Sequence, residues 1–381
     1  MVVLEDRISE WETKGEILDG YFNPAGAFDR VTVLGLVGDR PADETIARLS
    51  GPAGHRYVNA GLDRRSLFLR TLGLRPGRLA GILGQLSDNV AEDPPQVLRA
   101  YGDGLAAVAA AAIGRRLQIP HAVSLHTTPD PEVQARHLGA RDRLWRRLLV
   151  PAVLQSLRDA GAVMAVYAPI RDHLPPDIAA RTVVVPNAVG IPSPPAFRTH
   201  DGGPLRALWL GRQMPGRDPR PVIRALETTP NTTLTLIGDG PLRAAAQRLA
   251  AERGLAARTK FIPALENREL CARLPDHDVL VVHSDFREMP KTVMEAALSG
   301  LPVVVNRLPA AQSPEYGDIP AVLVDAEPGA YAAALRDLEG NTPKREALAR
   351  ETQDAAWKAW NPGRVAEQAA DLLRGLAAGQ G

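Results

Sequence analysis

The sequence predicts an α/β protein made of two doubly wound, Rossmann-like domains, each with a parallel sheet that helices cover on both faces. Short apolar runs alternate with longer helical patterns along the 381 residues, and this order produces parallel sheets. A segment rich in proline and glycine, residues 190–203, interrupts the alternation near the middle of the chain. The length also exceeds what one core usually needs, so two domains are expected.

The elements of the first half follow from short apolar runs separated by longer helical patterns. Strands are expected at 31–36, 121–125, 163–167 and 182–185. Helices are expected at 97–117 and 144–158, where apolar residues recur with helical spacing. We assign residues 1–190 to this domain.

The second half repeats the same pattern with more strands. The expected strands are 205–210, 233–237, 260–262, 279–283, 302–306 and 321–324, and the expected helices are 220–226, 241–253 and 291–298. Residues 345–376 have a strongly helical pattern, and Asn361-Pro362-Gly363 should break it because proline cannot continue a helix. We assign 191–361 to the second domain.

Composition excludes several classes of protein. The net charge is +1, so no overall field favours nucleic acid. Cys271 is the only cysteine, which excludes an intrachain disulfide, fits a reducing compartment and predicts a buried thiol. The start of the chain has no signal-peptide pattern, and no uncharged apolar run approaches the ~20 residues of a membrane span. We therefore expect a cytoplasmic protein without a transmembrane segment or a nucleic-acid partner, its oligomeric state left open.

The stretch 284–305 carries the strongest functional signal. Pro290 lies in an expected loop, a helix begins near Lys291, and a buried strand follows. The unpaired N–H groups and positive dipole end at the start of such a helix favour a phosphate. Glu295 lies about one turn inside, where a carboxylate could accept hydrogen bonds from ribose hydroxyls. Together these features predict a nucleotide-sugar site.

Two shorter motifs precede this stretch. Gly211 and Arg212 follow an expected buried strand and Arg217 comes shortly after, at the strand end where open α/β sheets bind ligands. Two guanidinium groups can hold a pyrophosphate through paired hydrogen bonds. Gly238 and Gly240 end the next strand and permit close backbone approach to a ligand. Each motif alone also fits a structural role, as solvated loop arginines or a simple strand-to-helix turn.

In this order, the motifs resemble the donor half of the family-4 retaining glycosyltransferases, which have the GT-B fold. The resemblance covers residues 205–324 well and extends more weakly to 119–126 and 184–189, where Ala188 replaces the usual glycine. It implies two Rossmann-like domains facing across a cleft. The second domain would bind the nucleotide-sugar donor, the first would bind the acceptor, and a terminal helix, 362–378, would cross back onto the first domain.

The resemblance also implies roles for individual residues. Arg212 and Arg217 would bind the donor diphosphate, with Arg217 where the family usually has lysine. Backbone N–H groups over 289–292 would face the phosphates, and Glu295 would hold the ribose hydroxyls. His126, from the first domain, would approach the transferred sugar and act in catalysis. The donor-binding set is Gly211, Arg212, Arg217, Gly238, Met289, Pro290, Lys291, Thr292 and Glu295.

One position departs from the family pattern. A glutamate eight positions before Glu295 is expected to contact the donor sugar, but this chain has Arg287 there and Glu288 next to it. Either the loop shifts by one residue, so that Glu288 takes the catalytic role, or the sugar is recognised differently.

The first half offers weaker candidates for the acceptor. Residues 14–29 combine turn, aromatic and charged residues, and such loops often bind ligands. Glu16, Tyr21 and Asn23 are therefore acceptor candidates, while a packed surface Ω-loop explains the segment equally well. His126 follows a buried strand, where the sites of α/β proteins gather.

The implied reaction moves a hexosyl group from a nucleotide-diphosphate sugar, UDP- favoured over GDP-, to a hydroxyl of a small-molecule or glycan acceptor with retained anomeric configuration. No cofactor is expected, since the nucleotide sugar is a substrate. The resemblance also implies that no metal is needed. We see no basic amphipathic surface helix, which favours a soluble acceptor. The alternatives are a non-catalytic nucleotide-sugar binding subunit, and an epimerase or phosphorylase on the same fold.

Overall fold

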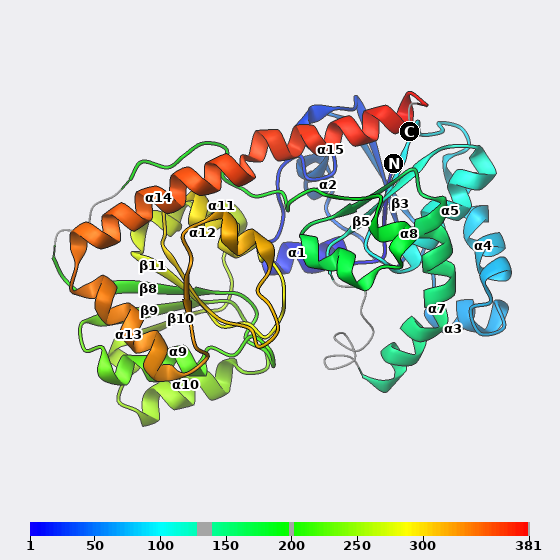
Figure 1. Cartoon of the computed structure of the whole chain (residues 1–381). Coiled ribbons are helices and arrows are strands. Elements are labelled where there is room, and N and C mark those ends of the chain that lie inside the picture. Colours follow the sequence, from blue (N-terminus) through cyan, green and yellow to red (C-terminus); the bar gives the residue numbers. More distant parts are fainter. Residues whose placement is uncertain (128–138, 198–201, 380–381) are drawn as a thin grey trace. The chain divides into compact units, whose positions relative to one another are not determined.

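The computed structural model describes residues 1–127, 139–197 and 202–379 (Figure 1). The chain divides into two compact units, each with its own parallel sheet. Unit 1 contains Met1–Asn187 and Gly363–Gly381, and unit 2 contains Ala188–Pro362. Residues 198–201 of the linker segment discussed above lie outside the described residues.

The sheet of unit 1 has seven parallel strands in the order β3-β2-β1-β4-β5-β6-β7. Its central strands are buried, so they consist of apolar residues on both faces, as parallel sheets require. The strands are β1 (Val2–Leu4), β2 (Arg30–Gly35), β3 (Gly54–Asn59), β4 (Leu98–Tyr101), β5 (His121–Leu125), β6 (Ala162–Ala165) and β7 (Thr182–Val184).

Helices connect these strands and cover the sheet. The alanine-rich α5 is almost wholly buried, because its small side chains let it pack closely against its neighbours α4 and α7. The α-helices of the unit are α1 (Ile8–Lys14), α2 (Asp43–Ser50), α3 (Arg64–Arg70), α4 (Pro76–Gly84), α5 (Leu105–Leu117), α7 (Ala140–Asp159), α8 (Pro176–Ala179) and α15 (Pro362–Ala377).

One expected helix of unit 1 is wrong, and three strands were not expected. The segment 97–117 is not one helix, because Leu98–Tyr101 forms β4 and the turn 102–104 separates it from α5. Its two glycines, Gly102 with φ 97° and Gly104, make this turn. The strands β1 and β3 were missed along with β4. The first is very short, and β3 is a partly exposed edge strand with mixed polarity.

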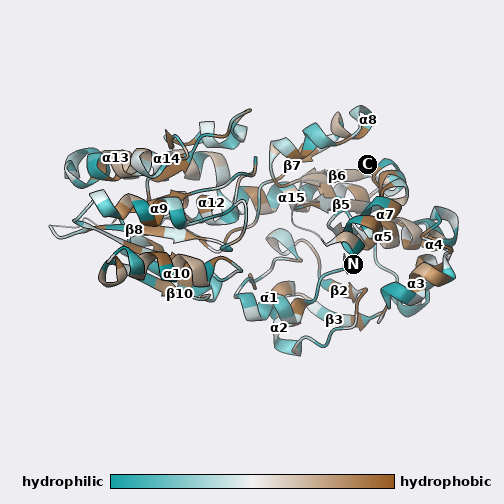
Figure 2. Ribbon diagram, turned by 90° about the horizontal axis from the view of Figure 1, so that it is seen from below, coloured by the Kyte–Doolittle hydropathy of each residue, from teal (hydrophilic) through white to brown (hydrophobic). Residues whose placement is uncertain are grey.

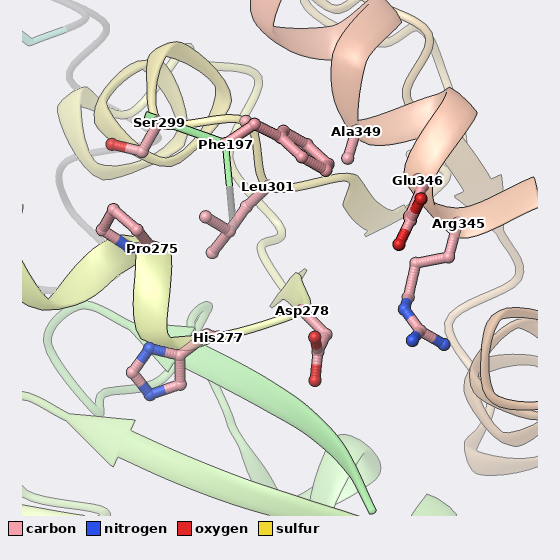
Figure 3. A pocket seen from close by; sticks show the side chains of 10 residues that line it. Phe197, Pro275, His277, Asp278, Ser299, Leu301, Arg345, Glu346 and Ala349 are labelled. Carbon is pink, nitrogen blue, oxygen red and sulfur yellow. The ribbon is translucent and has the colours of Figure 1, made fainter. Parts of the chain in front are cut away.

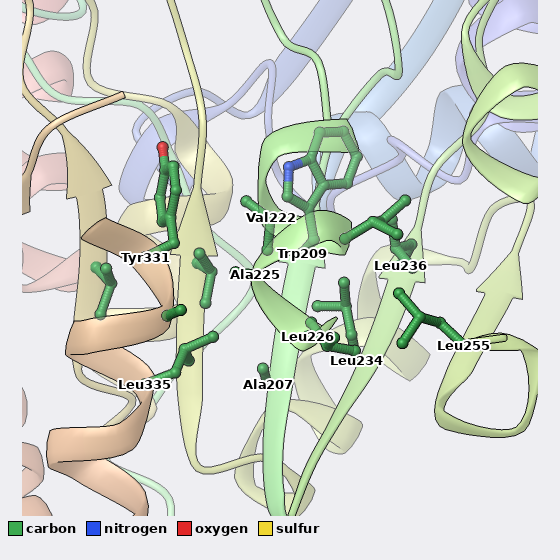
Figure 4. Close-up of a cluster of buried hydrophobic side chains, with 14 of the residues drawn as sticks. Ala207, Trp209, Val222, Ala225, Leu226, Leu234, Leu236, Leu255, Tyr331 and Leu335 are labelled. Atoms are coloured by element: carbon green, nitrogen blue, oxygen red, sulfur yellow. The ribbon is translucent and has the colours of Figure 1, made fainter. Parts of the chain in front are cut away.

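The sheet of unit 2 has six parallel strands in the order β10-β9-β8-β11-β12-β13. A buried cluster packs against it, with Trp209 and Tyr331 as its largest side chains (Figure 4). The strands are β8 (Leu205–Leu210), β9 (Thr232–Ile237), β10 (Thr259–Ile262), β11 (Val279–Val282), β12 (Val303–Asn306) and β13 (Val322–Val324).

The helices of unit 2 are amphipathic, and apolar and polar stretches alternate along their ribbons (Figure 2). The expected helix at 291–298 is found with the same bounds, as α12. The set is α9 (Arg220–Ala225), α10 (Arg243–Glu252), α11 (Asn267–Arg273), α12 (Lys291–Leu298), α13 (Pro328–Glu339) and α14 (Thr342–Trp360).

The last helix, α15, belongs to unit 1 although its sequence follows unit 2. The break expected at Asn361-Pro362 separates it from α14. Its apolar face, including Val365 and Leu373, packs in one buried cluster with Val97 and Met164 of the first half. Within 1–127, 139–197 and 202–379, no helix is both long and apolar enough to cross a membrane.

Candidate functional site

The strand order of unit 2 reverses between β8 and β11, so the loops after these two strands diverge at a topological switch point. Ligands of open α/β sheets bind at such a point, outside the carboxyl ends of the strands. Arg212 and Arg217 follow β8, while Arg287 and Glu288 follow β11. The fold therefore brings four of the residues discussed from sequence to one edge of the sheet.

Two glycines allow the loops after β8 and β9 to lie against each other. Gly211 has φ 138° and Gly238 has φ 132°, a region that side chains disfavour. A Cβ atom at Gly238 would overlap the carbonyl oxygen of Gly211. The buried Gln213 joins the loops, since its Nε2 donates to the Gly238 carbonyl at 2.8 Å. Gly211 and Gly238, both predicted from the sequence, thus fix the backbone at the switch point.

Arg212 and Arg217 differ in their surroundings. Arg212 is exposed and has no ion pair or hydrogen bond with the residues that the structure describes. Arg217 holds Glu288, with its Nε 2.9 Å from Oε1 and its Nη2 2.6 Å from both carboxylate oxygens. Its guanidinium also lies 5.2 Å from the centre of the Phe286 ring. Arg212 is therefore available to an anion, whereas Arg217 already has a carboxylate partner.

The ion pair with Arg217 also fixes the position of the Glu288 carboxylate. Ser284 Oγ lies 3.4 Å from Glu288 Oε1, so the carboxylate is held from its own loop and from the loop after β8. Arg287 turns elsewhere, and its Nε donates to the Gln312 carbonyl at 3.3 Å. Of the two neighbours, Glu288 is the one that reaches the β8 loop at the switch point.

Helix α12 begins at Lys291 with Pro290 as its N-cap residue, and no side chain caps it. The Val293 amide of its first turn donates to the Pro290 carbonyl at 3.0 Å, while the amides of Lys291 and Thr292 come too early in the helix to have an intrahelical acceptor. Pro290 has no N–H, so the N–H groups over 289–292 belong to Met289, Lys291 and Thr292. Met289 is buried, while Lys291 and Thr292 are partly exposed. The amides of Lys291 and Thr292 are thus the ones suited to bind an anion.

Glu295 is buried, with 1% of its surface exposed. Its Oε1 accepts from Asn267 Nδ2 at 2.8 Å and lies 3.7 Å from Lys291 Nζ. Its Oε2 is buried without a hydrogen bond in the described part of the chain. Burial, with the Glu295 charge beside it, raises the pKa of the Cys271 thiol to about 12, so this cysteine is an inert neutral neighbour, as expected.

The structure adds two residues that sequence reasoning did not select, Gln213 and Asn267. Both are buried amides at the predicted site, and Gln213 Oε1 has no partner among the described residues. A buried unsatisfied polar atom is costly, and a bound ligand or water is the usual explanation. No local sequence signal singled out Asn267, which the structure places at the start of α11.

In unit 1, His126 follows β5 and stacks on Tyr101, with ring centres 5.2 Å apart and planes 12° apart. Asn187 hydrogen-bonds the imidazole, while Nε2 is buried with no partner in the residues described. Burial is the main cause that lowers the pKa of His126 to about 4, and the nearby Arg99 adds to it. The side chain is therefore a neutral imidazole at physiological pH.

The acceptor candidates of unit 1 differ in their surroundings, since some are packed in the fold and one is exposed. Tyr21 belongs to the aromatic cluster around Tyr101, whose hydroxyl donates to the Tyr21 carbonyl at 3.0 Å. Asn23 is buried, and it both donates to the Phe28 carbonyl and accepts from the Phe28 amide. This geometry favours the structural alternative for Asn23, whereas Glu16 is exposed.

The switch point of unit 1 lies between β1 and β4, and its acidic residues were not selected from sequence. Glu5 follows β1 and accepts from the Leu105 amide at 2.8 Å, at the start of α5. It also pairs with Arg64 at 3.1 Å. Burial raises the pKa of the Glu5 carboxyl, against the lowering effect of these two partners. Glu5 thus supports the start of α5.

A pocket of unit 2 lies at the opposite edge of its sheet, at the start of β11 (Figure 3). Asp278 there accepts from the Arg206 backbone at 2.8 Å and from its guanidinium. In the part of the chain that is described, no group of three or more histidine, cysteine or acidic residues is placed to hold a metal.

Comparison with known proteins agrees with this geometry. Residues 219–341, within unit 2, match the family described as Glycosyl transferases group 1. The chain is 25% identical to the glycogen synthase of Mycobacterium tuberculosis strain H37Rv over 65% of its own length and 58% of that protein. It is 26% identical to the 2-deoxystreptamine N-acetyl-D-glucosaminyltransferase of Streptomyces fradiae, over 79% of the chain and 75% of that enzyme. Residues 219–341 are thus similar to the group 1 glycosyltransferases, and the chain spans just over half the length of the glycogen synthase.

The fold is shared with solved glycosyltransferase-like structures. HepE of Anabaena, solved in complex with UDP and glucose, superposes with a TM-score of 0.70 at 17% identity, covering 98% of this chain and 99% of that one. Its likeness extends over both units. The resemblance predicted from the ordered motifs is therefore confirmed at the level of the GT-B glycosyltransferase fold, and the α/β class with it.

Proposed function

We propose that this chain is a retaining glycosyltransferase of family 4. It moves a hexosyl group from a nucleotide-diphosphate sugar to a hydroxyl of a small-molecule or glycan acceptor. UDP is the favoured nucleotide, and the complex of HepE with UDP and glucose supports this choice. A cytoplasmic location and independence of metal belong to the same proposal.

One observation carries the proposal. At the switch point of unit 2, Arg212 stands exposed with no counter-ion among the described residues, whereas Arg217 and Lys291 each face a glutamate. The amides that open α12 and the buried Glu295, with its unpartnered Oε2, follow the same sheet edge. The cation and the free amides suit the diphosphate of a nucleotide, and the buried carboxylate suits its ribose hydroxyls.

The chemistry follows from these side chains. As the bond from the anomeric carbon to the diphosphate breaks, negative charge develops on the leaving oxygen, and Arg212 with the first amides of α12 stabilises it. Glu288, oriented by Arg217, faces the sugar, and its charge favours the positive oxocarbenium-like transition state. His126 is neutral and offers the sugar a hydrogen bond without adding positive charge. The acceptor hydroxyl attacks the anomeric carbon on the face from which the diphosphate leaves, and its proton passes to the departing diphosphate oxygen.

A second candidate, a non-catalytic nucleotide-sugar binding subunit, is favoured by one observation. Arg287 occupies the position expected for the sugar-binding glutamate, and Glu288 is already held by Arg217. If that pair stays closed around a bound donor, the chain would keep the nucleotide without activating the sugar.

Turnover of sugar nucleotides separates these two candidates. The purified chain should release nucleoside diphosphate from UDP-hexoses in the presence of hydroxyl acceptors, and NMR of the product should show the anomeric configuration of the donor. Binding of UDP without cleavage of UDP- or GDP-sugars with any acceptor would favour the binding subunit. An inverted product would exclude the retaining mechanism.

A further inference from the structure

Unit 1 carries a surface on which arginines and exposed apolar side chains gather. We call it the basic apolar patch, formed by residues 64–84 and 139–149. These two segments hold nine arginines and one acidic residue, Asp142, although the whole chain has a net charge of only +1. The charge is thus strongly local. The four large hydrophobic side chains that are exposed in the described residues all lie here, at Phe68, Leu69, Leu72 and Leu144.

The two segments form one surface because their helices contact each other. Arg64, at the start of α3, pairs with Asp142 of α7 at 3.2 Å and lies 5.5 Å from the Trp145 ring centre. Helix α4 also packs against α7. Both views of the chain show α3, α4 and α7 as neighbours (Figures 1 and 2).

The apolar part of the patch is held outward by a fixed turn. Leu69 is 63% exposed and Leu72 is 54% exposed. Leu72, Gly73 and Leu74 have φ of 53°, 82° and 62°, so two leucines adopt the left-handed conformation that side chains disfavour. Thr71 Oγ1 fixes the turn by donating to the Leu67 carbonyl and accepting from the Leu74 amide. Leucine is a costly choice at Leu72 unless its exposed side chain has a use.

The charged part of the patch is available to a partner. Six of its exposed arginines have no ion pair with any residue that the structure describes. They are Arg65, Arg70, Arg75, Arg78, Arg141 and Arg147.

We propose that the basic apolar patch docks unit 1 on the surface of a membrane that contains anionic lipids. Arginines attract the anionic headgroups, and apolar side chains projecting between them enter the boundary of the acyl chains. The combination distinguishes this partner from nucleic acid, whose phosphates need no exposed leucines. The patch would lie on the membrane and not span it.

Co-sedimentation with vesicles tests the proposal and needs no sugar donor, so its failure is distinct from a failure of glycosyl transfer. The full chain should bind vesicles with about 30% phosphatidylglycerol in phosphatidylcholine, and not phosphatidylcholine alone. Binding should disappear as salt is raised toward about 0.5 M. Equal binding to both vesicles, or none to the anionic ones at low salt, would overturn the proposal.

Two double variants locate the binding surface. Arg70→Gln with Arg75→Gln should weaken binding about 25-fold, since each arginine near an anionic surface contributes about fivefold. Arg224→Gln with Arg248→Gln is the matched control, because these exposed arginines of α9 and α10 are also unpaired within the described chain, and it should bind like the parent. Equal losses in both pairs would show non-specific charge attraction and refute the assignment.

The apolar side chains are tested separately. Leu69→Ser with Leu72→Asn should reduce vesicle binding while the thermal midpoint is kept, because both side chains are exposed and asparagine tolerates the left-handed turn. Light scattering on the same samples tests whether a second copy of the chain occupies the patch instead. A dimer of the parent that this variant dissociates would identify the patch as an interface between two copies, and would overturn the membrane proposal.

Discussion

The carboxyl edges of the two sheets are built from different chemistry. In unit 2, charged groups dominate the edge, with Arg212 exposed and Arg217 paired to Glu288. In unit 1, the edge around His126 is aromatic, and its histidine is neutral. Similar sheets therefore carry edges of different character, with charged side chains in unit 2 and stacked rings beside a neutral imidazole in unit 1. The comparison teaches that the fold supplies the position and the loop residues supply the chemistry.

The charged edge can be broken at Arg212, where we expect the largest effect. Arg212→Ala should lower donor turnover by about 100-fold or more, because removing one preorganised charge from a leaving group costs that much. Steady-state kinetics and calorimetry with UDP measure the loss. Arg224→Ala, an exposed arginine of α9, is the control and should change neither value. Unchanged affinity for UDP in Arg212→Ala would remove this residue from the diphosphate site.

Substitution in the pair of Arg217 and Glu288 should have a smaller effect, and it distinguishes recognition of the sugar from binding of the nucleotide. Glu288→Gln keeps the shape but removes the charge, so we expect turnover to fall about 30-fold while the Kd for UDP changes little. Arg287→Gln is the neighbouring control, since its guanidinium contacts the Gln312 carbonyl. If the Arg287 variant lost turnover and the Glu288 variant did not, the shifted-glutamate hypothesis would be wrong.

The aromatic edge gives the smallest effect, on stability against pH. The pKa of His126 is lowered from 6.5 to about 4 by folding. The unfolded chain therefore binds more protons between these values, and stability is lost as pH falls from about 6.5 toward 4. His126→Phe should retain the stack on Tyr101 and remove about 2 kcal/mol of this loss at pH 5, measured by urea unfolding at pH 7 and pH 5.

An identical pH dependence in parent and His126→Phe would mean that the imidazole is not buried as neutral in the folded state.

Much of unit 2 could be predicted because its signals are local. The bounds of α12 follow from Pro290 before it and Gly300 after it, and the turn at Gly238 needs glycine wherever its neighbours lie. Unit 1 was harder to predict. Its central strand β1 has only three residues, and β4 runs into the apolar pattern of α5, so periodicity alone merged them into a helix.

The sequence by itself determined the parallel α/β class, the break before the last helix and the order of the donor motifs, because each depends on residues close together in the chain. Tertiary structure decided which charges meet. The pair of Arg217 with Glu288, the amide of Asn267 at Glu295 and the contact of α3 with α7 join residues that are far apart in sequence. Only folding sets such distances, and electrostatic and apolar contacts depend on distance.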